Sequence, residues 1–233
     1  LVLDFPERIC RERNALRTDR NFGEHVIRNQ CSQLRKSLRG LEREGFRHVN
    51  IFRSPEELTG LTIRREPLWN NKKGEVGPFD IIGDIHGCLD EALELIASLG
   101  YSVGSEDGRY NVTHPDGRKL IFVGDLVDRG PNSPGVIRLA MDSVASGAAF
   151  CVAGNHDVKL SRALRGRDVK LTHGLAESLE QLKAESDEFK ATAAEWLDGL
   201  VSHYVFDGGR LVVAHAGLRE EMHGRGSGAV RQF

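Results

Sequence analysis

The stretch GDLVDRG, residues 124–130, follows an apolar run and decides how the second part of the chain is interpreted. Three related stretches occur: GDIHG at 83–87, GNHD at 154–157 and VAHAG at 213–217. Each follows a short apolar segment and carries a small residue that lets the backbone turn and a ligand approach. A single Asp after a strand is common in turns and helix caps, whereas four such clusters in succession indicate a site.

Apolar and helical segments alternate between the four clusters. The pattern predicts strands at 79–83, 120–124, 148–153 and 211–214, and helices at 89–99, 134–144, 175–184 and 189–200. Sheets of this kind place their sites at the carboxyl ends of the strands. The sequence therefore predicts an α/β domain over residues 79–233, with the polar clusters gathered at one edge.

Residues 1–66 differ in charge from the rest of the chain. They carry 14 Lys and Arg against 10 Asp and Glu, whereas the whole chain has a net charge of −2. Thirteen of these 14 basic residues are Arg, which binds phosphate in a bidentate manner. This is consistent with either a solvated helical face or contact with a polyanion.

This first segment reads as a separate region. We expect a strand at 1–5, helices at about 7–17 and 26–40, and a strand at 49–52. Residues 67–78, which include the turn-rich NNKKG, are expected to form a linker.

Composition excludes several classes of protein. No apolar run approaches the length of a membrane-spanning helix, and the N-terminus has no signal-peptide pattern. The four cysteines lie far apart without a C-x-x-C pair, which disfavours a structural zinc site or a disulfide framework. We therefore expect a cytoplasmic protein with reduced thiols and no membrane contact.

The clustered residue types suit a pair of metal ions. Carboxylate, imidazole and amide ligands are typical of intermediate divalent ions such as Mn²⁺, Ni²⁺, Zn²⁺ or Fe²⁺. One carboxylate has two oxygens and can bridge two ions. Two ions about 3.5–4 Å apart can hold the attacking and leaving oxygens of an in-line displacement.

The motifs D-x-H at 84–86, GDxxDRG at 124–130 and GNHD at 154–157 resemble the signature of calcineurin-like metallophosphoesterases, whose layered mixed β-sheets are flanked by helices. The resemblance implies two divalent metal ions, with Mn²⁺ expected and Ni²⁺ as the alternative. The implied metal ligands are Asp84, His86, the bridging Asp125, Asn155 and His215. It also implies that Arg129 binds the phosphate and that His156, paired with Asp128, either acts as general acid to the leaving oxygen or stabilises the transition state.

A closer likeness covers the whole chain. ERN at 12–14, PLWN at 67–70 and GPFD at 77–80 resemble the kinase–phosphatase junction of bacterial polynucleotide kinase-phosphatases. The likeness implies that residues 1–66 are the end of a P-loop kinase domain, with Arg13 and Arg17 sharing one face of a helical lid that reaches phosphates. No Walker A motif is present, so this segment alone cannot be a working kinase.

That family acts on RNA ends. The resemblance implies removal of 2′-, 3′- or 2′,3′-cyclic phosphate, an RNA 3′-end ribose methyltransferase as partner, and self-association of the full-length protein. The family has one further metal-ligating His downstream of His215, whereas this sequence stops soon afterwards, at Phe233. We therefore expect a fragment truncated in its phosphoesterase domain, with the second ion bound more weakly.

Other functions fit parts of the pattern. The four clusters alone suit a serine/threonine protein phosphatase or a dinucleoside-tetraphosphate hydrolase equally well. A non-catalytic RNA-binding module is the alternative from another class, and the intact ligand set argues against it. Two further histidines, His173 and His203, are expected to be structural.

Overall fold

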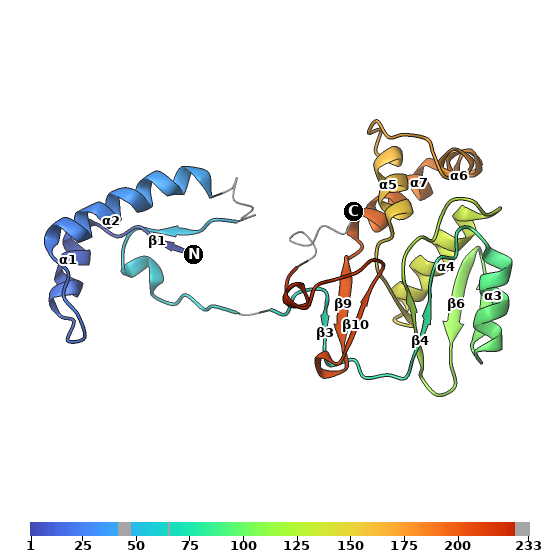
Figure 1. Ribbon diagram of the computed structural model, residues 1–233, viewed down its shortest axis with the longest axis horizontal. Coiled ribbons are helices and arrows are strands. Elements are labelled where there is room, and N and C mark those ends of the chain that lie inside the picture. The colour runs from blue at the N-terminus through green and yellow to red at the C-terminus, as the bar shows by residue number, and fades with distance from the viewer. Residues whose placement is uncertain (42–47, 65, 227–233) are drawn as a thin grey trace. The chain divides into compact units, whose positions relative to one another are not determined.

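The computed structural model describes residues 1–41, 48–64 and 66–226 (Figure 1). The chain divides into two compact units, Leu1–Glu66 and Pro67–Phe233, hereafter unit 1 and unit 2. Among the described residues, no helix is both long and apolar enough to cross a membrane.

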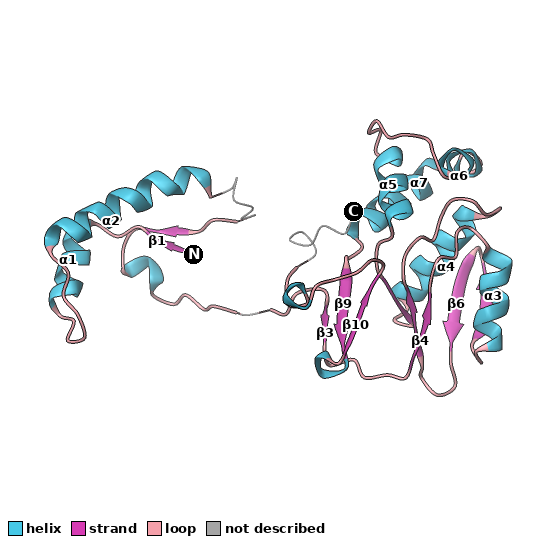
Figure 2. Ribbon diagram, viewed as in Figure 1, coloured by secondary structure: helices cyan, strands magenta, loops and turns pink. Residues whose placement is uncertain are grey.

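The described part of unit 1 contains two α-helices, two short 3-10 helices and a short parallel strand pair (Figure 2). Its elements are β1 (Val2–Leu3), α1 (Glu7–Ala15), α2 (Glu24–Ser37) and β2 (Ile51–Phe52). The buried apolar side chains among its described residues are those of Phe5 and Ile27.

The expected pair of lid arginines does not share a helix face. Helix α1 ends at Ala15, so Arg17 lies beyond it and forms an ion pair with Asp19 at 2.9 Å. The Arg13 guanidinium instead lies 4.9 Å from the centroid of the Phe5 ring. The expected helix to residue 17 was too long because its apolar positions do not continue past Leu16, which is exposed.

Unit 2 contains two three-stranded sheets, a hairpin and five helices among its described residues. Its strands are β3 (Asn71–Lys72), β4 (Phe79–Ile82), β5 (Ser102–Glu106), β6 (Arg109–Thr113), β7 (Lys119–Phe122), β8 (Ala149–Cys151), β9 (His203–Phe206) and β10 (Leu211–Ala214). Its helices are α3 (Leu89–Ser98), α4 (Ser133–Ala145), α5 (Asn155–Leu164), α6 (Leu175–Leu182) and α7 (Asp187–Gly199).

The predicted alternation of strands and helices is confirmed in its main elements. Strands β4, β7 and β8 form a wholly parallel sheet, and β10, β9 and β3 form a mixed one. The antiparallel β5–β6 hairpin and helix α5 were not expected from the sequence.

The segment expected to be a linker, residues 67–78, is built into unit 2 instead. Asn71–Lys72 pairs with β9, and the buried Asn70 side chain contacts the ring of His203 at 2.8 Å. The turn-forming residues of this stretch lie in the turns that flank a short strand.

The parallel sheet is covered on both faces because side chains alternate along its strands. In β7, Leu120 and Phe122 belong to the large core beneath the helices, whereas Ile121 packs toward the second sheet. There the rings of Phe79 and Phe150 each lie 4.9 Å from that of Phe206. This packing fixes the carboxyl ends of the parallel strands, from which the site residues extend.

Candidate metal centre and active site

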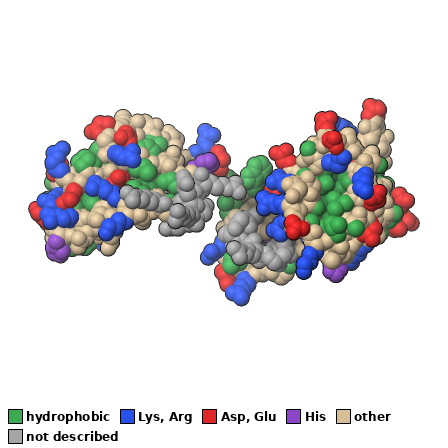
Figure 3. Space-filling model, turned by 90° about the horizontal axis from the view of Figure 1, so that it is seen from above, with side chains coloured by type: hydrophobic (Ala, Val, Ile, Leu, Met, Phe, Trp, Pro, Cys, Tyr) green, Lys and Arg blue, Asp and Glu red, His purple; other side chains and the backbone are tan. Residues whose placement is uncertain are grey.

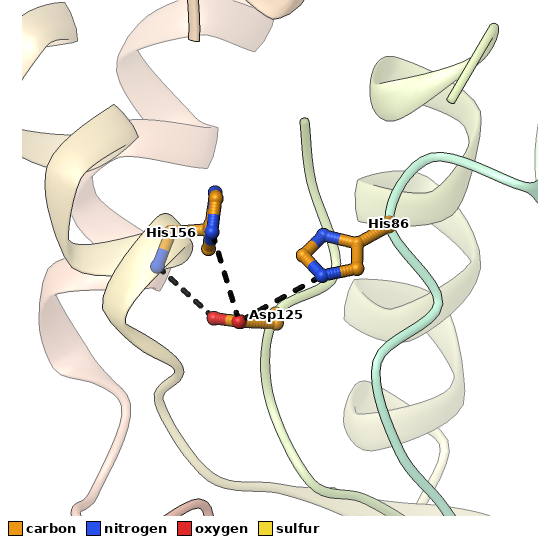
Figure 4. A group of neighbouring side chains, drawn as sticks. All are labelled: His86, Asp125 and His156. Atoms are coloured by element: carbon orange, nitrogen blue, oxygen red, sulfur yellow. Dashed lines mark hydrogen bonds and ion pairs between the residues drawn. The ribbon is translucent and has the colours of Figure 1, made fainter. Parts of the chain in front are cut away.

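Three histidine rings surround the carboxylate of Asp125, which lies three residues after the end of β7 and follows Gly124. The Nε2 atoms of His86 and His156 each lie 3.9 Å from its Oδ2 atom, and that of His215 lies 3.5 Å away. Figure 4 shows the first two rings converging on the carboxylate, with His86 from the loop after β4 and His156 from α5, and their centroids lie 4.9 Å apart. Two groups able to hold a metal ion share Asp125: His86 with His156, and Asp84 with His215.

The rings of His86 and His215 are each oriented by an acceptor at the other nitrogen. His86 Nδ1 lies 2.9 Å from the carbonyl oxygen of Val127, and His215 Nδ1 lies 2.8 Å from that of Val123. A carbonyl oxygen can only accept, so Nδ1 carries the proton and Nε2 presents its lone pair toward Asp125. Ligating histidines in metalloproteins are held in this way, so the donor set fits a pair of divalent ions.

The two carboxylates of the second group differ in exposure. The Asp125 side chain is 7% exposed and lies at the floor of the site, whereas that of Asp84 is 66% exposed. Asp84 Oδ1 lies 4.0 Å from His215 Nδ1. An ion held by the two carboxylates and His215 Nε2 would therefore be open to solvent and substrate on the Asp84 side.

The backbone is constrained at these positions. Asp84, His86, Asp125, Asp128 and Arg129 all have positive φ values, between 48° and 73°. Such conformations cost non-glycine residues free energy and are concentrated at functional sites.

Close packing between loops holds this arrangement. A Cβ atom on Gly154 would lie 2.1 Å from the backbone nitrogen of Asp125, and one on Gly130 would lie 2.2 Å from the carbonyl oxygen of His86. Only glycine allows these approaches. Gly154 in GNHD and Gly130 in GDLVDRG are therefore required because any larger residue would clash with neighbouring site residues.

His156 and Asp128 form a buried pair. His156 Nδ1 lies 2.6 Å from Asp128 Oδ2, and neither side chain is more than 5% exposed. On the opposite side of the ring, His156 Nε2 lies 3.5 Å from Arg129 Nη2. The guanidinium can only donate, which again leaves Nε2 as the acceptor in this state.

The buried carboxylate of Asp157 forms hydrogen bonds with two separate segments of the site. Asp157 accepts hydrogen bonds from the backbone N–H groups of Leu126 and Gly154, each at 2.9 Å. Complete burial raises the pKa of Asp157 to about 6, while these two hydrogen bonds oppose the shift. Its role is to join the loop that carries Asp125 to the start of α5, which carries His156.

The structure bears differently on the roles expected for two further residues. Asn155 is the exposed first residue of α5, and its role as a ligand stays a prediction. His203 is buried between Asn70 and the Ser202 hydroxyl, 2.9 Å from its Nδ1, and burial lowers the pKa of its imidazole. This agrees with the structural role expected for it.

Sequence reasoning missed a set of polar side chains behind the site. Ser133, Ser178 and Gln181 contact the Asp128–Gly130 loop. Ser178 is 50 residues from Asp128, and an isolated Ser within a helix gives no signal of such a contact.

The family is now decided by comparison with known proteins. The model of the calcineurin-like phosphoesterases matches residues 77–230, which include all four clusters. The chain belongs to the calcineurin-like phosphoesterase family. The expected enzyme class, a metal-dependent phosphoesterase, and the expected α/β fold are thereby confirmed. The family uses a binuclear divalent metal site, and the His and Asp residues around Asp125 provide candidate ligands.

Several relatives carry a more specific name. The asymmetrical bis(5′-nucleosyl)-tetraphosphatase PrpE of Halalkalibacterium halodurans is 46% identical over 147 residues, 61% of this chain and 58% of the relative. PrpE of Bacillus subtilis is 41% identical over 159 residues, 66% of this chain and 64% of the relative. The chain thus spans less than two thirds of the length of these relatives.

Among solved structures, a serine/threonine phosphatase from Saccharomyces cerevisiae is similar with a TM-score of 0.47 and 22% identity. The match covers 66% of this chain and 43% of that protein.

Proposed function

We propose that unit 2 is a phosphoesterase that uses two divalent ions and cleaves a phosphoanhydride of a dinucleoside polyphosphate. The single observation that carries the reaction class is the pair of ligand groups sharing Asp125, with Arg129 beside them. The substrate class is supported by the relatives named bis(5′-nucleosyl)-tetraphosphatase, whose identity to this chain reaches 46%.

Each proposed role follows from the position of a side chain. Asp125, His86 and His215 would hold the ions together with Asp84 and Asn155. His156, although near enough to His86 and Asp125 to ligate an ion, is assigned to proton transfer instead. The bound ions would supply an activated water and neutralise charge on the phosphate.

Two further side chains would act on the substrate itself. The Arg129 side chain is exposed at the mouth of the site and can donate to two phosphate oxygens. His156, oriented by Asp128 through Nδ1, would donate a proton from Nε2 to the leaving oxygen once it is protonated.

A second candidate function concerns RNA ends, and unit 1 is the observation that favours it. This unit lies outside the region shared with the family model, and its sequence has a net positive charge. It contains a cavity of about 430 Å³ lined by Arg28, Arg35 and Lys36 among others.

Part of this positive charge is already paired. Arg28 lies 3.7 Å from Glu7, and Arg35 lies 3.3 Å from Asp4. Lys and Arg side chains are interspersed with acidic ones over the face of unit 1 seen in Figure 3. The interpretation of unit 1 as the end of a kinase domain, and therefore of unit 2 as an RNA-end phosphatase, is supported by the sequence resemblance to the kinase–phosphatase junction alone.

The test compares substrates on the full-length protein that contains this chain. With Mn²⁺, we expect faster hydrolysis of diadenosine tetraphosphate, measured as the two nucleotide products, than release of phosphate from RNA ending in a 3′-phosphate or 2′,3′-cyclic phosphate, or from a phosphoserine peptide. Preference for the RNA ends would establish the second candidate. Asp125→Asn is the control for contaminating phosphatases, because it should remove all metal-dependent hydrolysis. If Asp125→Asn and the wild type behaved alike on every substrate, unit 2 would not be the phosphoesterase.

A further inference from the structure

Helix α6 contacts the Asp128–Gly130 loop at three points that lie on one side of the helix. Gly174, its N-cap residue, is followed by Ser178 and Gln181 at spacings of four and three, which place them on the same face. A Cβ atom on Gly174 would lie 2.4 Å from the backbone nitrogen of Arg129. The other two side chains form hydrogen bonds to this loop or to the residues that flank it.

The Ser178 hydroxyl forms a hydrogen bond with the carboxylate of Asp128, which orients His156. Its Oγ atom lies 2.7 Å from Asp128 Oδ1, whereas His156 Nδ1 lies 2.6 Å from Oδ2 of the same carboxylate. An ionised carboxylate only accepts, so the single Ser178 proton points to Asp128. The hydroxyl of Ser133, 2.9 Å away, then donates to Ser178, and the backbone N–H of Asp128 also donates to it at 3.0 Å.

These contacts form one continuous chain of hydrogen bonds from Ser133 through Ser178 and Asp128 to His156. The side chains lie in the buried interior, where hydrogen bonds are stronger and an unpaired group costs more than at the surface. Both carboxylate oxygens of Asp128 are thereby engaged from opposite directions, which prevents rotation of the carboxylate.

Gln181 fixes the same loop independently. Its Nε2 atom donates to the carbonyl oxygen of Gly130 at 2.9 Å, and its Oε1 atom accepts from the backbone N–H of Ser133 at 2.7 Å. The loop residues Asp128 and Arg129 both have positive φ, so they need such external support.

We propose that Ser178 is a positioning residue for the phosphoesterase reaction, acting through Asp128 to hold the His156 ring with Nε2 toward the substrate. The proposal rests on the proposed function, because His156 is the group that would donate the proton. Ser178 itself does not reach the substrate, so its effect should be confined to what His156 does.

A double-mutant cycle tests this coupling on the full-length protein with Mn²⁺. Ser178→Ala should lower kcat for an alkyl phosphate by about 10- to 100-fold, with little change in KM. The loss should be much smaller with p-nitrophenyl phosphate, whose leaving group needs no proton. In a His156→Ala background, Ser178→Ala should cause no further loss.

Two variants separate positioning from folding. Ser178→Thr retains the hydroxyl and should recover most of the activity, whereas Ser143→Ala removes another fully buried serine hydroxyl, one that donates to Leu139 in α4, and should leave kcat close to wild type. The proposal is overturned if Ser178→Ala causes the same loss with and without His156, or if its effect equals that of Ser143→Ala. Should Ser178→Ala not fold, Ser178→Cys, whose thiol is only a weak donor to Asp128, replaces it and should show the same dependence on the leaving group.

A spectroscopic measurement keeps the proposal separate from the proposed function. The ring ¹⁵N shifts of His156, assigned by their loss in His156→Gln, should report the Nδ1–H tautomer in the wild type and a mixture of tautomers in Ser178→Ala. Unchanged ring shifts would overturn the positioning role even in an active enzyme. An inactive wild type with the expected change in shifts would instead refute the proposed function alone.

Discussion

The close approach of Gly154 to Asp125 makes Gly154→Ala an informative perturbation. The added Cβ atom would lie 2.1 Å from the backbone nitrogen of Asp125 and 2.2 Å from its Oδ1 atom. Real Cβ atoms essentially never approach closer than 3.0 Å, so the two loops must separate by roughly 0.9 Å. The contact is with backbone, which cannot move aside as the end of a flexible side chain does.

The expected consequences concern both stability and metal binding. Overpacking of this kind costs about 1–3 kcal/mol. At about 2–4 °C per kcal/mol for a chain of this size, the melting temperature of unit 2 should fall by ~2–12 °C. Metal–ligand distances tolerate only about ±0.2 Å, so a displaced Asp125 should also weaken Mn²⁺ binding, by at least ~10-fold.

Thermal unfolding and Mn²⁺ titration of the two proteins are the assays. Gly199→Ala is the matched control, since no atom lies within 4 Å of a Cβ at that position near the end of α7. The control should keep both the melting temperature and the Mn²⁺ affinity of the wild type. If Gly154→Ala behaves like Gly199→Ala, the packing of the two loops does not hold Asp125 in place, and the reasoning is refuted.

Two further predictions concern proton transfer and acid stability. His156→Ala should retain Mn²⁺ binding but lose about 10²–10⁴-fold in turnover of poor leaving groups, and much less with p-nitrophenyl phosphate; an equal loss on both substrates would remove the general-acid role. The pKa of Asp80 is lowered by hydrogen bonds from Arg118, and then by that from Tyr101. This stabilisation is present above the pKa that Asp has in the unfolded chain, about 3.9, and is lost as the pH falls through the lowered value. Asp80→Asn should thus be less stable at pH 7 and lose less stability than the wild type on acidification, as measured by urea unfolding; parallel pH profiles would contradict this.

Much of the candidate site could be predicted because the motifs follow strands. Asp84, Asp125 and Asn155 come directly after short apolar segments, and the carboxyl ends of neighbouring parallel strands meet at one edge of the sheet. This topology brings together side chains that are far apart in the sequence, such as those of His86 and Asp125, whereas His215 reaches the site from β10 of the other sheet. The polar clusters could therefore be grouped into one site without knowing how the helices pack.

Other features of the fold were not predicted, some although a local signal was present and some because no local signal exists. The β5–β6 hairpin carries a recognisable signal, Asp107-Gly108, both with positive φ as its tight turn requires. The GNHD motif indicates only a site cluster after a strand, and the helix that begins at Asn155 was therefore not predicted. The contacts of Ser178 depend on how α6 packs against a distant loop, which no local pattern encodes.

The shared carboxylate is the centre of this account, and metal uptake by Asp125→Ala tests it most directly. Mn²⁺ binding and hydrolysis of diadenosine tetraphosphate should be followed together for the wild type and this variant of the full-length protein. We expect two ions bound by the wild type, and neither tight binding nor hydrolysis in Asp125→Ala, because both ligand groups include this residue. Two ions bound with wild-type affinity by Asp125→Ala would contradict a metal pair organised around Asp125.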